Sequence, residues 1–192
     1  MAIMTKPVLR ERILAARRAV PAQVRLAEAT ALQTHLRAAF RPGDTVCGYV
    51  PVGSEPGSPA MLDALDTARV RVLLPVARAR QPMQWGAYSP GRLVAAPFGL
   101  REPAPPWLGP EAIGTAAAVL VPALAVDRRG VRLGRGAGFY DRALPLADPA
   151  ARLIAVVRDD EVLDELPMEP HDVPMTHVVT PGRGIVALAM RE

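Results

Sequence analysis

Near the start of the chain, hydrophobic and polar residues recur with the spacing of amphipathic helices. Between residues 5 and 18, apolar side chains fall on one helical face and arginines mostly lie elsewhere, which predicts a helix. Pro21 fits the first turn of a second helix that continues to Ala39, and Pro42 with Gly43 ends it. Two consecutive helices are therefore expected here.

Further along, short apolar runs alternate with segments of helical pattern. The longest run, residues 116–126, is apolar and rich in β-branched residues, as in a strand whose sheet is covered on both faces. Ser58 and Pro59 predict the N-cap and first turn of a helix over 61–68, and the glycine- and proline-rich residues 97–110 predict loops. The other expected elements are strands over 45–50, 70–75, 83–88, 152–157 and 185–189, and a short helix over 139–144.

Strands that alternate with helices are typical of an α/β fold. We therefore predict a single three-layer domain over residues 1–192, with a mostly parallel central sheet flanked by helices. A chain of 192 residues suits one such domain, and the sequence contains neither an internal repeat nor a linker that would divide it.

The apolar runs are too short for a membrane-spanning protein. None approaches the roughly 18 residues that cross a bilayer, and residues 1–20 carry charges throughout instead of a signal-peptide core. These features predict a cytoplasmic protein without membrane contact. Arginine-rich amphipathic starts also occur in organelle transit peptides, but Glu11 and the absence of serine in this segment argue against one. The single cysteine, Cys47, has no cysteine partner and is expected to be a small buried apolar residue.

The charge of the chain bears on its partners. A formal net charge of +4 is compatible with nucleic-acid binding, but the basic residues are scattered in blocks of at most two or three, so nucleic acid is not an expected partner. Arginine supplies 22 of the 23 basic residues, and Lys6 is the only lysine. A single lysine kept at this position is suggestive of a specific role.

The most informative segment is residues 119–144, where an apolar strand leads through Gly130, Gly134, Gly136 and Gly138 into a helix. Glycines allow positive φ and expose successive backbone N–H groups, and a helix start adds roughly half a unit of positive charge. The segment therefore has the architecture of a phosphate-binding loop.

Charged residues in this segment fit the same chemistry. Arg132 and Arg135 lie between the glycines, and guanidinium groups donate paired hydrogen bonds to phosphate oxygens. Asp141 lies in the first turn of the helix, where a carboxylate can hold magnesium. Neither GxxxxGK[ST] nor the GxGxxG spacing is present. A glycine-rich turn that only reverses the chain is the alternative, and the two arginines and Asp141 favour an anion site.

At these residues the chain resembles the 5-formyltetrahydrofolate cyclo-ligases. The hallmark of that family is a strand ending in V-P-G, then F-D and G-x-R-L-G-x-G-x-G-Y-Y-D, and the segment here reads VPALAVDRRGVRLGRGAGFYD. Four weaker motifs also stand in the order that the family has. They are K-x-x-L-R at residues 6–10, an E-x-x-T-like segment at 55–58, a G-I-x-E-P-like loop at 98–103, and H-D-V-x-x-x-x-x-V-T at 171–180.

The resemblance implies an ATP- and Mg²⁺-dependent enzyme whose partners are two small molecules, 5-formyltetrahydrofolate and ATP. In that family ATP phosphorylates the formyl oxygen to give an iminophosphate, the neighbouring aryl-amine nitrogen attacks, and loss of phosphate leaves 5,10-methenyltetrahydrofolate, with ADP and phosphate as products. Such chemistry rests on positioning and on stabilising charge at the transferred phosphoryl group. The enzyme is expected to act as a monomer.

The resemblance also implies site residues. Arg135 and Asp141 match catalytic positions, and Asp141 and Asp172 match positions that hold magnesium. The positions on the substrate side are Val50, Glu55, Arg135 and Phe139. The nucleotide-binding positions are Lys6, Arg10, Arg132, Leu133, Gly134, Arg135, Gly136, Ala137, Gly138, Phe139 and Tyr140.

Several of these residues have a simpler alternative. Lys6 and Arg10 fit a solvated helix face, Asp172 fits a loop cap, and Glu55 fits an ordinary surface position. Aromatic and other large apolar side chains near strands and helix starts are more often core packing than ligand contacts, and this alternative covers Met83, Trp85, Tyr88, Phe139 and Tyr140.

The chain departs from the family pattern in ways that keep other functions open. Ala137 stands where lysine or glycine is common, and the loss of a lysine there removes one phosphate contact. The other replacements are Ala123 for a glycine, Ala125 and Val126 before Asp127 for an aromatic, Phe139 for a tyrosine and Ser58 for a threonine. The alternatives are a catalytically lapsed RNA- or nucleotide-binding regulatory protein of the same fold, and an ATP-dependent enzyme for a different formyl or amide substrate.

Overall fold

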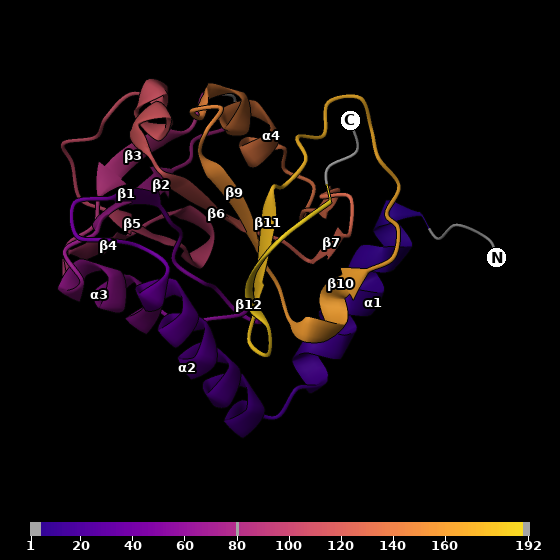
Figure 1. The fold of residues 1–192 in the computed structure, drawn as a ribbon. Helices are drawn as coiled ribbons and strands as arrows, with labels where there is room; N and C mark the ends of the chain where they lie inside the picture. Colours follow the sequence, from indigo (N-terminus) through magenta and orange to yellow (C-terminus); the bar gives the residue numbers. More distant parts are fainter. Residues whose placement is uncertain (1–4, 80, 190–192) are drawn as a thin grey trace.

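A seven-stranded sheet forms the centre of the protein in a computed structural model that describes residues 5–79 and 81–189 (Figure 1). The strand order is β12-β11-β9-β6-β1-β2-β3. The five inner strands are parallel to one another, and β3 and β12 close the two edges as antiparallel strands. The strands are β1 Thr45–Cys47, β2 Arg71–Val76, β3 Gln84–Ala87, β6 Ala118–Pro122, β9 Arg152–Val156, β11 His177–Thr180 and β12 Gly184–Ala187.

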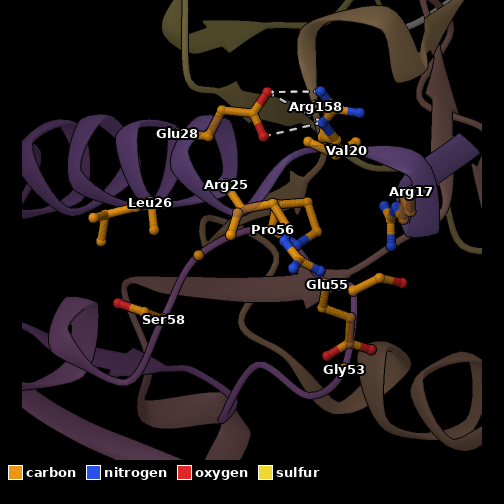
Figure 2. Close-up of a pocket in the computed structure, with 14 residues that line it drawn as sticks. Arg17, Val20, Arg25, Leu26, Glu28, Gly53, Glu55, Pro56, Ser58 and Arg158 are labelled. Atoms are coloured by element: carbon orange, nitrogen blue, oxygen red, sulfur yellow. Dashed lines mark hydrogen bonds and ion pairs between the residues drawn. The ribbon is translucent and has the colours of Figure 1, made fainter.

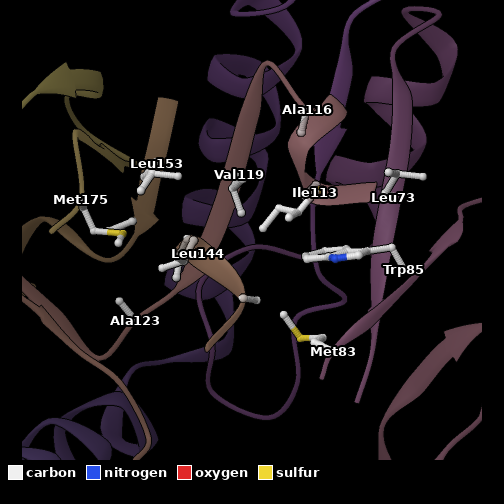
Figure 3. Packing of buried hydrophobic residues seen from close by; sticks show 14 of the residues in the cluster. Leu73, Met83, Trp85, Ile113, Ala116, Val119, Ala123, Leu144, Leu153 and Met175 are labelled. Atoms are coloured by element: carbon white, nitrogen blue, oxygen red, sulfur yellow. The ribbon is translucent and has the colours of Figure 1, made fainter. Parts of the chain in front are cut away.

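Helices cover both faces of this sheet, as the three-layer prediction requires. On one face, α2 (Ala22–Ala38) and α3 (Ala60–Thr67) pack against a buried cluster that includes Val46 and Leu74. On the other face, η2 (Pro110–Thr115), α4 (Phe139–Ala143) and η3 (Leu144–Leu146) pack against a second cluster (Figure 3). Neighbouring residues Leu73 and Leu74 point into different clusters because side chains alternate along a strand, so both faces demand apolar residues.

The amino-terminal helix α1 (Lys6–Ala19) packs on a separate small sheet. This sheet has the order β10-β7-β8 and consists of β7 Ala125–Asp127, β8 Arg132–Leu133 and β10 Val162–Leu163. Leu9, Ile13 and Leu14 of α1 pack against a buried cluster that includes Leu133 of β8 and Leu124, which precedes β7. Figure 1 shows α1 beside β7 and β10 as a consequence.

Three expectations about local structure were wrong. Residues 116–126 form two strands in different sheets, because Pro122 ends the ladder of β6 and Leu124 then donates its backbone N–H to Leu133. The 97–110 stretch contains η1 (Pro97–Gly99) and β5 (Arg101–Pro103), which pairs with β4 (Leu93–Ala95). At the start of α3, the N-cap residue is Pro59, and no side chain caps the helix, so Ser58 does not have that role.

The topology places a crevice at the carboxyl ends of β1 and β6. The chain leaves β1 toward β2 on one side, whereas it leaves β6 toward β9 on the other side. Ligands of open α/β sheets bind at such a switch point. The segments that follow these two strands, residues 48–58 and 123–138, are therefore expected to carry the functional groups. Within the described residues, no helix combines the length and apolar character needed to cross a membrane.

Candidate functional site

The glycine loop, residues 134–138, connects β8 to α4 and is open to solvent at residues 135–137. Gly136 has φ 100° and Gly138 has φ 70°, so the turn requires positive φ at two of the glycines predicted to supply it. Helix α4 has only five residues, and a macrodipole summed over so few peptides contributes little charge. The positive charge of the loop therefore comes from side chains and less from the helix start that the sequence suggested.

Helix α1 brings Arg10 onto this loop. The Nε atom of Arg10 donates a hydrogen bond to the carbonyl oxygen of Gly134 over 2.8 Å. A Cβ atom placed on Gly136 would lie 3.6 Å from the Arg10 guanidinium carbon, which shows that the guanidinium lies beside the loop backbone. The structure thus joins two parts of the predicted nucleotide site that are separated by more than a hundred residues of sequence.

Lys6, one turn earlier on α1, contacts the segment that contains Asp172. Its Nζ atom is 2.9 Å from Oδ2 of Asp172 and 3.4 Å from Oε1 of Glu169. Burial opposes ionisation of Asp172, but the bonds from Lys6 and from the Glu169 N–H outweigh it and lower the pKa of this carboxyl below its usual value. Lys6 and Arg10 are therefore engaged in specific contacts, and the alternative of a solvated helix face does not describe them.

Arg132 and Asp141 form an ion pair across the loop, with 2.9 Å between Nη2 and Oδ1. The Arg132 side chain is 8% exposed, and its guanidinium lies 5.8 Å from the centre of the Tyr140 ring. Its Nε atom is buried without a hydrogen-bond partner in the described part of the chain. Arg132 is therefore held at the base of the loop, whereas Arg135 is half exposed at its tip.

Arg135 contacts Glu55, which follows β1. Its Nε atom donates to Oε1 of Glu55 over 3.2 Å, and the other carboxylate oxygen of Glu55 accepts the N–H of Val52 over 3.0 Å. Glu55 is only 10% exposed, so it is not an ordinary surface glutamate. The glycine loop and the β1 segment thus meet at the switch point, as the topology predicts.

Two tyrosines with buried hydroxyls lie in the electrostatic field of Glu55. The hydroxyls of Tyr49 and Tyr140 are buried, and neither has a hydrogen-bond partner among the residues that the structure describes. Burial raises the pKa of both phenols, and the Glu55 carboxylate raises it further, so both remain neutral hydrogen-bond donors. Sequence reasoning missed Tyr49, although its position at the end of β1, next to Val50, was a signal for it.

The metal ligands expected at this site are Asp141 and Asp172. Asp172 belongs to a group with Glu169 and His171 whose possible ligand atoms all lie within 4.8 Å of one another, and Asp141 is not part of that group. Carboxylates suit Mg²⁺, and both aspartates are partly exposed and reachable. Each is neutralised by its own cation, Lys6 or Arg132. A polyphosphate that attracted these cations would leave the carboxylates available to a metal.

The other predicted site residues range from buried to exposed. The side chain of Leu133 is buried against α1, so only its backbone can face a nucleotide. Val50 is partly buried against the cluster under α2 and α3, and Phe139 and Tyr140 are partly buried against the opposite cluster. Ala137 is exposed in the loop. The prediction of strand packing is confirmed for Met83, Trp85 and Tyr88, which are all buried.

Comparison with known proteins agrees with this geometry. A family model described as the 5-formyltetrahydrofolate cyclo-ligase family matches residues 2–181. The chain belongs to this family. It is 62% identical over 193 residues to a 5-formyltetrahydrofolate cyclo-ligase of Mycolicibacterium smegmatis, an alignment that covers 98% of this chain and 100% of the relative.

Other members of the family are more distant. A 5-formyltetrahydrofolate cyclo-ligase of Escherichia coli K12 is 36% identical over 66 residues, which is 34% of this chain and 36% of the relative. The solution structure of Aquifex aeolicus 5,10-methenyltetrahydrofolate synthetase matches with a TM-score of 0.81 at 25% identity, over 98% of this chain and 95% of that one. These relatives are named as enzymes, and none of these names favours an RNA-binding regulator.

Proposed function

We propose that the protein converts 5-formyltetrahydrofolate and ATP into 5,10-methenyltetrahydrofolate, ADP and phosphate, with Mg²⁺ as the metal. The observation that carries the proposal is the convergence of Arg10, Arg132 and Arg135 on one solvent-open glycine loop at the switch point of the sheet. Family membership supplies the reaction class, and the loop supplies the groups that it needs.

The loop cations fit the phosphoryl-transfer step. In this step the formyl oxygen forms a bond to the γ-phosphorus of ATP, the bond between that phosphorus and the bridging oxygen breaks, and ADP leaves. Arg135 is the cation best placed to stabilise the negative charge on the transferred phosphoryl group, because it lies at the loop tip and is half exposed. Arg10 and Arg132 are fixed beside the loop backbone and suit the phosphates that remain on ADP.

The ring-closing step needs orientation more than acid–base chemistry. The aryl-amine nitrogen attacks the activated formyl carbon, the carbon–oxygen bond to phosphate breaks, and the nitrogen loses its proton. Val50 and Glu55 lie in the segment that follows β1, Phe139 begins α4, and the three residues are proposed to hold the pterin. The Glu55 carboxylate accepts hydrogen bonds, and its present partner Arg135 would turn to the phosphoryl group. The same movement would couple folate binding to phosphate binding.

Asp141 and Asp172 are proposed to hold Mg²⁺ directly or through water. Bound magnesium would neutralise part of the phosphate charge during transfer. Lys6 pairs with Asp172 and Arg132 pairs with Asp141, so both carboxylates are already held in position before a metal binds. We further infer that the enzyme works in the cytoplasm as a monomer, which size-exclusion chromatography with light scattering would test.

Formation of the methenyl product, which absorbs in the near ultraviolet, tests the proposed reaction. Purified protein should form it from 5-formyltetrahydrofolate only when ATP and Mg²⁺ are both present, with ADP released in equimolar amount. An ATP-dependent enzyme for another formyl or amide substrate would instead release ADP with that compound and not with 5-formyltetrahydrofolate. Salt-sensitive RNA binding without ATP turnover would support the regulatory alternative.

A further inference from the structure

The glycine loop presents an open surface to any anion that it binds. Figure 2 shows Glu55 among the residues that line a cavity of about 300 Å³ between α2 and the loop 53–58. None of the loop residues 134–138 lines this cavity. A phosphate on the glycine loop is therefore not enclosed by a pocket, and the side chains that lie against the loop backbone decide how well it is held.

Guanidinium groups lie against the first two glycines of the loop. A Cβ atom added at Gly134 would be 2.6 Å from Nη1 of Arg132, and one added at Gly136 would be 3.6 Å from the guanidinium carbon of Arg10. Because glycine has no side chain, a guanidinium group can approach the loop backbone closely at both positions. The glycines therefore make room for cations in addition to allowing the turn.

Arg142 of α4 has the corresponding place at the third glycine. Its Nη1 atom would be 3.1 Å from a Cβ atom added at Gly138, which is tighter than ordinary side-chain contact. Its guanidinium carbon lies 5.4 Å from the centre of the Phe139 ring, and this cation–π contact holds the side chain beside the loop. Arg142 is exposed, so its guanidinium group is accessible to a ligand.

The charge of Arg142 has no acidic partner, unlike the charges of two other arginines of the site. Arg132 is paired with Asp141, and Arg135 is paired with Glu55. Within the described residues, no carboxylate forms an ion pair with Arg142. A guanidinium group has five N–H donors that suit phosphate oxygens. Arg142 can therefore bind a phosphate without first breaking an ion pair.

We propose that Arg142 is a further phosphate-binding residue of the ATP site. This assignment rests on the proposed function, which puts the triphosphate of ATP on the glycine loop. Arg142 lies beside Gly138, and Ala137 precedes that glycine as an exposed residue without charge. The cation at this end of the loop is then supplied by α4, whereas α1 and β8 supply Arg10 and Arg132 at the other end.

Removal of the Arg142 charge tests the proposal. Arg142→Gln should weaken the binding of AMP-PNP, an ATP analogue that is not hydrolysed, roughly three- to tenfold in calorimetry with Mg²⁺, because a hydrogen bond between charged groups is lost. The KM for ATP should rise by a similar factor. Arg142→Lys keeps the charge and should keep most of the affinity, and Ala137→Lys in the Arg142→Gln protein should restore it. Arg37→Gln removes an exposed arginine of α2 outside the loop and is the matched control.

The binding of 5-formyltetrahydrofolate separates a phosphate contact from a packing role. If Arg142 only supports the Phe139 ring, Arg142→Gln should weaken the binding of this folate and leave that of AMP-PNP unchanged, which would overturn the proposal. Unchanged binding of both ligands would overturn it, and so would an equal loss for both, because the whole loop would then be disturbed.

The two lysine variants test whether the charge itself is the cause. A loss of AMP-PNP affinity in Arg142→Gln that neither Arg142→Lys nor Ala137→Lys reduces would overturn the proposal. AMP-PNP binding that depends on Arg142, without any cyclisation of 5-formyltetrahydrofolate, would leave this assignment intact and refute the proposed function.

Discussion

Arg135 at the tip of the glycine loop lies 3.2 Å from Glu55, its partner across the switch point, through its Nε atom and Oε1 of the carboxylate. The two residues are 80 positions apart in the sequence. Resemblance to the family implies a substrate position for Glu55, and both a nucleotide and a substrate position for Arg135. Because Arg135 is half exposed while Glu55 is nearly buried, the arginine is the partner that is free to move. Binding of either substrate is therefore expected to change the contact between Arg135 and Glu55.

Single substitutions of the two partners should show that the residues act in different steps. Arg135→Ala is expected to lower kcat about 10²–10³-fold, as for the loss of a group that stabilises charge in the transition state. Glu55→Gln should mainly raise the KM for 5-formyltetrahydrofolate. Steady-state kinetics with each substrate varied in turn would measure both effects, with exposed Arg92→Ala as the control.

The kinetics of the two single variants distinguish a catalytic role from a structural one. If Arg135→Ala keeps a wild-type kcat, Arg135 does not act on the transferred phosphoryl group. If Glu55→Gln lowers kcat as strongly as Arg135→Ala and leaves the KM for folate unchanged, the carboxylate is not a pterin contact. Thermal unfolding of both variants should remain near that of the wild type, since the pair is partly solvated.

Much of the fold could be predicted from the sequence because the deciding signals are local. Period-3.6 patterns predicted α1 and α2, and short apolar runs predicted β1, β2, β6 and β9, since strands buried on both faces require apolar residues at every position. The small sheet β10-β7-β8 was missed, because strands of two or three residues are too short to show any period. β11 was missed because it has only four residues and lies within the H-D-V-x-x-x-x-x-V-T segment.

The site was predictable as a set of residue types but not as a set of partners. Glycines and arginines in residues 130–138 indicated an anion loop without reference to the rest of the chain. The contacts of Arg10 with Gly134 and of Arg17 with Glu161 join segments that are more than a hundred residues apart, and only the assembled fold brings them together. Burial decides the part played by Leu133 in the same way, since its sequence neighbours are loop residues but its side chain packs under α1.

Arg17→Met should destabilise the protein. Arg17 and Glu161 form a buried bidentate ion pair at 2.6 Å and 2.8 Å, and removal of one partner leaves a buried charge, which costs about 3–5 kcal/mol. The double variant Arg17→Met with Glu161→Leu should recover most of this loss, because two apolar side chains can replace a buried pair. Chemical denaturation of the three proteins would measure the free energies of unfolding. A double variant no more stable than Arg17→Met would show that the hydrogen bonds from Arg17 to Ala123 and from the Arg158 N–H to Glu161 outweigh the ion pair itself.

Stability should fall slightly as the pH drops below neutrality because of His177. Burial, with a smaller effect of Arg152, lowers the pKa of this imidazole below its usual value of 6.5. Since the unfolded chain then binds a proton more readily than the folded one, the stabilisation is complete above pH 6.5 and decreases as the pH falls from there toward the folded pKa. Chemical denaturation between pH 7.5 and about 5.5 should show a smaller slope in His177→Gln than in the wild type. Equal slopes would mean that other groups set the dependence.

The metal assignment makes the most selective prediction, because the site offers several possible ligands for one Mg²⁺ ion. These are the carboxylates of Asp141, Asp172 and Glu169 and the imidazole of His171. If Asp141 and Asp172 hold Mg²⁺, Asp141→Asn and Asp172→Asn should each raise the Mg²⁺ concentration for half-maximal turnover roughly tenfold or more. His171→Asn should leave it unchanged, although His171 lies in the group with Asp172 and Glu169, because imidazole is a poor ligand for magnesium. A titration of turnover against Mg²⁺ measures all three variants. A shift in His171→Asn together with none in Asp141→Asn would move the metal site from the glycine loop to residues 169–172.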